Sequence, residues 1–141
     1  MHIEELDTPH LLVELNGLED NLDRYQDYFS KHGIGLRPHI KTHKSLTIAH
    51  MQMRRGAIGI TCQKLGEAEV MVAGGVDRDV LIPFNIMGRA KLERLTALTR
   101  RTTLTVAADS KITIRGLSEA TMAAGVSVGV VIELGGAGRC G

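Results

Sequence analysis

Aromatic side chains are scarce in this sequence. They make up 3% of its 141 residues, and tryptophan is absent. An excess of charge of one sign is lacking too, because 17 basic and 16 acidic residues leave a formal net charge of +1. A nucleic-acid-binding surface needs stacking aromatic groups or a basic patch, so no nucleic-acid partner is expected.

Long apolar runs are also missing. None approaches the roughly 20 residues that cross a bilayer, so no membrane association is expected. Met1 leads directly into polar and acidic residues, which is unlike a signal peptide. The two cysteines, Cys62 and Cys140, lack the spacing of metal ligands, and they suit a reducing, cytoplasmic setting.

Short apolar segments alternate with helical periodicity along the chain. A leading strand is expected at residues 11–14, followed by a helix that ends near Gly33. Further strands are expected at 35–40, 57–62, 80–84, 104–108 and 128–134. Between them, helices are expected at 45–55, 64–73, 89–100 and 111–124. This alternation predicts an α/β fold with a parallel sheet and crossover helices.

Polar residues follow the predicted strands at a regular interval of 22, 22, 24 and 24 residues. They are Lys41, Gln63, Asn85, Asp109 and Glu133. Proteins of the α/β class bind their ligands at the carboxyl ends of parallel strands, so a site is expected there.

Five such units fit either a doubly wound sheet or the first part of an eight-stranded barrel. A doubly wound domain, such as a flavodoxin-like binding or signalling module, normally covers its last strand with another helix. Only seven residues, 135–141, follow the last predicted strand, and they carry no helical pattern. The sequence therefore favours an incomplete barrel.

The segment 35–44 concentrates basic side chains on one predicted strand. Side chains alternate along a strand, so Arg37, His39 and Lys41 are expected on the face that lines a barrel interior. Burying such groups is costly unless an anionic or reactive partner lies beside them. A desolvated lysine among other cations has a lowered pKa and attacks carbonyl groups more readily. The pattern predicts Schiff-base chemistry on Lys41 or Lys44, and the shared face favours Lys41.

This segment, Arg37-Pro-His-Ile-Lys-Thr-His-Lys44, together with Thr8-Pro9 before a hydrophobic strand, resembles a known family. It is similar to the N-terminal part of the fold-type III enzymes that depend on pyridoxal 5'-phosphate (PLP). The branch is that of D-threonine aldolase and the D-serine dehydratase-like proteins, related to alanine racemase. Segments 59–69, 79–85 and 133–141 resemble later parts of the same domain.

The resemblance implies a fold and a set of site residues. The fold would be the first five βα units of a (β/α)8 barrel, so residues 1–141 would form a partial PLP-binding domain. Lys41 would be the Schiff-base lysine, and Arg139 would reach towards the cofactor ring. His39, Thr61 and Gln63 would be further cofactor contacts. One departure is the pair of glycines at 135–136, where the family usually has an acidic residue.

The resemblance also implies an activity. It is that of a PLP-dependent lyase, as in D-threonine aldolase, which cleaves β-hydroxy-D-amino acids to glycine and an aldehyde. A D-serine dehydratase-type deaminase, an alanine racemase-like enzyme and a non-catalytic PLP-binding barrel are the alternatives. The full-length protein would be a homodimer with a divalent metal, and this chain would supply no ligand to that metal. We expect the chain alone to be inactive and poorly stable, because the later barrel strands and a C-terminal β domain are absent from it.

Overall fold

The computed structural model describes residues 2–134 of the chain. At its centre is a parallel sheet of four strands that lie side by side in sequence order. They are β1 (Ile60–Thr61), β2 (Val80–Ile82), β3 (Leu104–Ala108) and β4 (Gly129–Ile132). One helix connects each strand to the next: α3 (Leu65–Ala73), α4 (Arg89–Leu98) and α5 (Lys111–Ala124).

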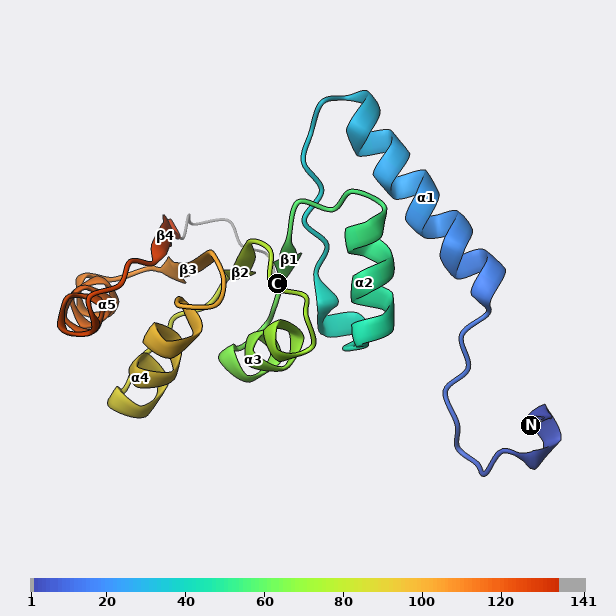
Figure 1. Cartoon of the computed structure of the whole chain (residues 1–141), viewed down its shortest axis with the longest axis horizontal. Helices are drawn as coiled ribbons and strands as arrows, with labels where there is room; N and C mark the ends of the chain where they lie inside the picture. The colour runs from blue at the N-terminus through green and yellow to red at the C-terminus, as the bar shows by residue number, and fades with distance from the viewer. Residues whose placement is uncertain (1, 135–141) are drawn as a thin grey trace.

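The three connecting helices lie along the same side of the sheet (Figure 1). Strands in sequential order with all helices on one side are the winding of a (β/α) barrel. A doubly wound sheet reverses its strand order and places helices on both faces. The expected α/β class and the incomplete barrel are therefore confirmed, and the doubly wound alternative is wrong.

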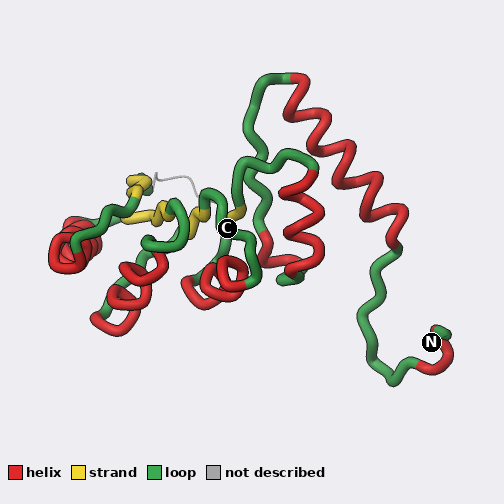
Figure 2. The backbone as a smooth tube through the Cα atoms, in the orientation of Figure 1, coloured by secondary structure: helices red, strands yellow, loops and turns green. Residues whose placement is uncertain are grey.

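Residues before β1 extend the sheet by one further segment. The N–H of Ile58 donates to the carbonyl of Leu36 at 2.9 Å, and the N–H of Thr61 donates to that of Pro38 at 2.8 Å. His39 forms an isolated parallel bridge with Thr61. The strand predicted at 35–40 is thus an extended segment beside β1, and Figure 2 draws it as loop. It stays short because Pro38 has no N–H to donate and a 3-10 turn begins at residue 40.

Two helices and two short 3-10 turns precede the sheet. The turns are η1 (Ile3–Glu5) and η2 (Ile40–Thr42), and the helices are α1 (Leu15–Lys31) and α2 (Leu46–Arg54). The leading strand predicted at 11–14 is not found in the described residues. A strand needs a partner for its hydrogen bonds, and these residues instead run exposed between η1 and α1 (Figure 1), with Leu11 88% exposed.

The core lies between the sheet and its helices. Most of the largest fully buried apolar side chains come from η2, the strands and the helices that follow them, among them Ile40, Ile60, Met71, Ile82, Leu95, Val106 and Leu117. By contrast, all four residues of β4 are exposed. No helix within residues 2–134 is long and apolar enough to cross a membrane.

Candidate active site

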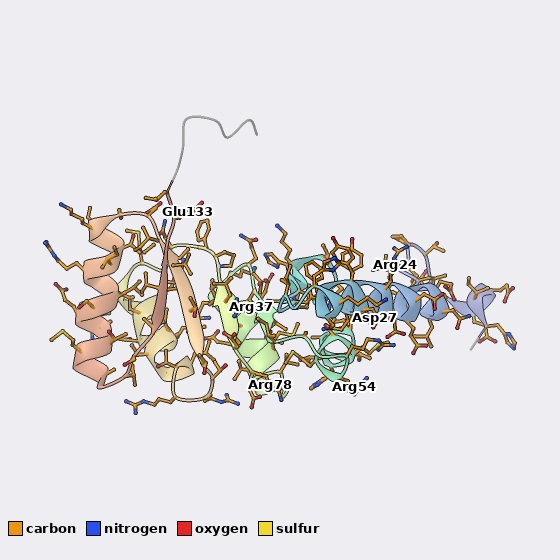
Figure 3. The ribbon with its side chains drawn as sticks, turned by 90° about the horizontal axis from the view of Figure 1, so that it is seen from above. Arg24, Asp27, Arg37, Arg54, Arg78 and Glu133 are labelled. Carbon is orange, nitrogen blue, oxygen red and sulfur yellow. The ribbon has the colours of Figure 1, made fainter. Side chains whose placement is uncertain are left out.

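The carboxyl ends of the strands form one edge of the sheet. The loops after neighbouring strands are connected there, because the N–H of Asp109 donates to Asn85 Oδ1 at 3.3 Å. The N–H of Glu133 likewise donates to the carbonyl of Ala108 at 2.9 Å. Figure 3 places Glu133 at this carboxyl edge and Arg78, which precedes β2, at the opposite edge. The polar residues that recur every 22 to 24 positions in the sequence therefore lie along one edge of the sheet, each following a strand or the first extended segment.

Lys41 lies on this edge, in the 3-10 turn η2. Ile40 is fully buried and anchors the turn, and the N–H of Lys44 donates to the Ile40 carbonyl at 2.8 Å. The Lys41 side chain is exposed and forms no ion pair within residues 2–134. Because Lys41 belongs to a turn, the strand alternation that predicted its inward direction ends before it.

His39 is half-buried beside Lys41. Its Nδ1 accepts a hydrogen bond from the backbone N–H of Lys41 at 3.3 Å. Burial, and then the charge of Lys41, lower the pKa of His39, while Gln63, Glu67 and the Thr61 backbone oppose the shift. The ring is therefore neutral near pH 7, with its proton on Nε2. That buried Nε2 makes no hydrogen bond of normal geometry in the described part of the chain, although the Gln63 side chain and the Thr61 backbone lie near enough to the ring to oppose the fall in its pKa.

Thr61 and Gln63 complete the group. Thr61 is buried at the end of β1 and is paired with His39 across the parallel bridge. Gln63 follows two residues later, and its N–H donates to Glu67 Oε2 at 2.8 Å. The structure thus brings together four of the five site residues that the sequence predicted. The fifth, Arg139, lies outside the described residues.

Arg37 does not join this group. It forms an ion pair with Asp79, which precedes β2 at the amino edge of the sheet. The side chains of the predicted basic face therefore have different partners. Arg37 binds Asp79 at the amino edge of the sheet, whereas His39 binds the backbone of Lys41.

Cys62 directly follows β1, between Thr61 and Gln63. Cys62 is fully buried, and burial followed by the nearby charge of Glu67 raises the pKa of its thiol to about 12. The thiol is therefore protonated and is not a nucleophile. Within residues 2–134, no group of three histidine, cysteine or acidic side chains could hold a metal ion.

The chemistry of the group fits a carbonyl compound with acceptor atoms. An exposed amine without a carboxylate partner can form a covalent bond with an aldehyde, and a buried N–H without an acceptor can donate to the same molecule. PLP carries both an aldehyde and several acceptor atoms. Lys41 would hold the aldehyde, and His39 Nε2 would donate to an acceptor. The residues present therefore fit this cofactor.

No family model matches this sequence. A curated relative, the 3-hydroxy-D-aspartate aldolase of Paracoccus denitrificans (strain Pd 1222), is 38% identical over 144 residues. That similarity covers 100% of this chain and 37% of the relative.

Two solved structures have the same architecture. D-threonine aldolase from Filomicrobium marinum matches with a TM-score of 0.92 and 44% identity, over 99% of this chain and 38% of that chain. D-threo-3-hydroxyaspartate dehydratase from Delftia sp. HT23 matches with a TM-score of 0.84 and 31% identity, over 95% of this chain and 37% of that chain. The chain belongs to the PLP-dependent fold-type III family that contains these proteins, and it spans 37% to 38% of their lengths.

Sequence reasoning did not single out Glu67, which contacts two parts of the site. Its carboxylate accepts the Gln63 N–H, and its Oε1 lies 3.6 Å from Lys44 Nζ. A signal existed, because an acidic residue in the first turn of a helix after a strand is placed to bind backbone N–H groups.

Proposed function

We propose that the full-length protein is a PLP-dependent lyase that cleaves β-hydroxy-D-amino acids, as D-threonine aldolase does, and that Lys41 is its Schiff-base lysine. One observation carries the proposal: the exposed Lys41 amine lies at the carboxyl edge of the sheet, beside the neutral His39, and has no carboxylate partner among residues 2–134. The 44% identity to a D-threonine aldolase over 99% of the chain supports the choice of reaction.

The proposed roles follow from the contacts. Lys41 holds the cofactor through its amine, and the fixed turn η2 sets where that amine lies. His39 donates its Nε2 proton to the bound molecule, since it makes no hydrogen bond of normal geometry in the described protein. Thr61 and Gln63, at the end of β1, limit the space beside the cofactor. Arg139 is proposed to reach towards the ring.

When bound, PLP would supply an electron-withdrawing ring that makes a bond at the Cα of the amino acid easier to break. Cleavage of the Cα–Cβ bond of a β-hydroxy-D-amino acid would give glycine and an aldehyde. We infer that parts of the full-length protein beyond this chain bind the cofactor phosphate and a divalent metal. We also propose that the full-length protein is a cytoplasmic homodimer with a small D-amino acid as its substrate.

A D-amino acid dehydratase is the second candidate. It is supported by the TM-score of 0.84 to a D-threo-3-hydroxyaspartate dehydratase. The two reactions share the cofactor and the lysine and differ in the bond that breaks. A dehydratase removes the α-proton and then the β-hydroxyl group of the substrate, whereas an aldolase breaks the Cα–Cβ bond.

Product analysis on the full-length protein tests the proposal. We expect glycine and acetaldehyde from D-threonine with the wild type, and no product with Lys41→Ala. Lys31→Ala, which removes an exposed lysine at the end of α1, should retain full activity. Pyruvate from D-serine without cleavage of D-threonine would establish the dehydratase instead. L-alanine from D-alanine would point to a racemase, and bound cofactor without any of these products would point to a non-catalytic PLP-binding protein.

A further inference from the structure

The turn that carries Lys41 contains an unfavourable backbone conformation. Lys44 has a φ of 50°, in the left-handed region that residues with a Cβ rarely adopt. Its N–H donates to the Ile40 carbonyl, so Lys44 ends the turn that carries Lys41, and its φ sets the direction in which the chain leaves that turn. Interactions elsewhere must hold such a residue in place. The side chain of Lys44 offers one of them.

Glu67 provides this interaction. Its side chain is 10% exposed, and its Oε1 lies 3.6 Å from Lys44 Nζ. Its Oε2 accepts the N–H of Gln63 at 2.8 Å. A single carboxylate in the first turn of α3 therefore contacts the turn after the first extended segment and the loop after β1. These are the two loops that carry Lys41 and Gln63.

We propose that Glu67 is a positioning residue for Lys41. It acts through Lys44, whose ammonium it holds, and it fixes the distance between the Lys41 turn and the Gln63 loop. The inference rests on the proposed function, because it assumes that Lys41 captures PLP. Glu67 itself need not touch the cofactor.

A purely structural role for Glu67 is the competing explanation. The N-cap residue of α3, Lys64, makes no side-chain hydrogen bond to the helix. In this explanation, the Glu67 carboxylate replaces the missing cap and does nothing more than stabilise the start of the helix. The two roles differ in their dependence on Lys44. A helix-stabilising carboxylate does not need the Lys44 ammonium, whereas a positioning carboxylate does.

The test is a double-mutant cycle on the full-length protein. The variants are Lys44→Met, Glu67→Gln and the combination of both. Glu67→Gln keeps an oxygen that can accept the Gln63 N–H but loses the ion pair. Lys44→Met removes a side chain that is 60% exposed, so it opens no cavity in the core. Glu69→Gln is the matched control, because Glu69 lies on the same helix and pairs with Arg94 at 2.8 Å.

The readout is the rate constant with which cofactor-free protein captures added PLP, followed by visible absorbance. The melting temperature of each variant is measured in parallel. We expect each single variant to slow capture about tenfold, below the roughly hundredfold cost of a 1 Å misplacement. The double variant should be no slower than either single variant. Glu69→Gln should capture PLP at the wild-type rate.

Capture by Glu67→Gln at the rate of Glu69→Gln would overturn the positioning role while leaving Lys41 as the cofactor lysine. Additive losses in the double variant would also overturn it, since Glu67 would then act without Lys44. A slowed Glu67→Gln beside a Lys44→Met variant of wild-type rate would assign Glu67 to helix stability alone. If the wild-type protein captures no PLP, the proposed function fails, and this inference fails with it.

Discussion

Arg37 forms an ion pair with Asp79, which stands 42 positions later and immediately before β2. Arg37 lies in the extended segment beside β1, and Asp79 lies at the amino end of β2, so the ion pair links this segment to the amino edge of the sheet. It also explains why the first basic residue of the motif at 37–44 lies apart from Lys41. The motif therefore combines a residue that stabilises the sheet with residues that face the proposed cofactor.

Asp79→Asn should lower the stability of the full-length protein and leave cofactor attachment unchanged. Asparagine tolerates the φ of 46° at this position, so the variant removes the charge without straining the backbone. Both side chains are about 30% exposed, which keeps the expected loss at about 1–2 kcal/mol. Urea unfolding measures it. Loss of bound PLP at unchanged stability would instead place the pair in the cofactor site.

Gly59→Ala should destabilise the protein strongly. An added Cβ would overlap the backbone oxygen of Asp79 and lie 2.9 Å from that of Arg78, and backbone atoms cannot turn aside as a flexible side chain can. We expect a loss of about 3 kcal/mol or more, since overpacking here must separate β1 from β2. Gly116→Ala is the control, because an added Cβ on helix α5 meets nothing closer than 3.8 Å.

In Gly116→Ala, the gain in helix propensity should raise stability by up to about 1 kcal/mol. Thermal unfolding of both variants checks the pair. Equal melting temperatures for the Gly59→Ala and Gly116→Ala variants would show that the backbone near Gly59 can move away from Asp79 at little cost.

His43 should make stability depend on pH. Its Nδ1 accepts the Ser45 N–H at 3.0 Å, and burial lowers its pKa, with Gln52 and Ser45 opposing the shift. The unfolded chain titrates near the ordinary value of 6.5, so it binds more protons than the folded state as pH falls below that value. The contribution of this histidine is therefore complete above about pH 6.5 and is lost towards the lower folded pKa.

Melting temperatures between pH 5 and pH 8 measure this effect. His43→Asn keeps an acceptor for the Ser45 N–H and should flatten the fall in stability below pH 6.5. His10→Asn removes an exposed histidine of the N-terminal segment and should leave the profile as in the wild type. A profile that His43→Asn does not change would show that the pKa of His43 is the same in the folded and unfolded states.

Local sequence patterns predicted much of the fold. Helix α5 and strand β3 occupy 111–124 and 104–108, as predicted, because each is bounded by clear local signals. Ser110 caps the helix start, and Gly125 ends it with a φ of 62°. Strands β1 and β2 are shorter than expected, since hydrophobicity continues past the residues that pair. The strand predicted at 11–14 fails for a related reason, because an apolar pattern does not supply a pairing partner.

The site was predictable where residues lie close together in the sequence. Spacing and the basic pattern singled out Lys41, His39 and Gln63 as candidates that the fold brings together, and their roles towards a cofactor stay predictions. The partners of Arg37 and Lys44 were not predictable, because strand register and a helix start bring Asp79 and Glu67 to them from distant positions. Among residues 2–134, the lack of a hydrogen bond of normal geometry at His39 Nε2 is likewise a property of packing, which no local pattern encodes.

The identity of the cofactor lysine is tested most directly by mapping the attachment site. Full-length protein is loaded with PLP, reduced with borohydride and digested, and the labelled peptide is sequenced by mass spectrometry. We predict that the label lies on Lys41, because its amine is exposed and forms no ion pair within residues 2–134, whereas Lys44 Nζ lies 3.6 Å from Glu67 Oε1. A label on Lys44, or no label on the segment 37–44, would contradict this assignment.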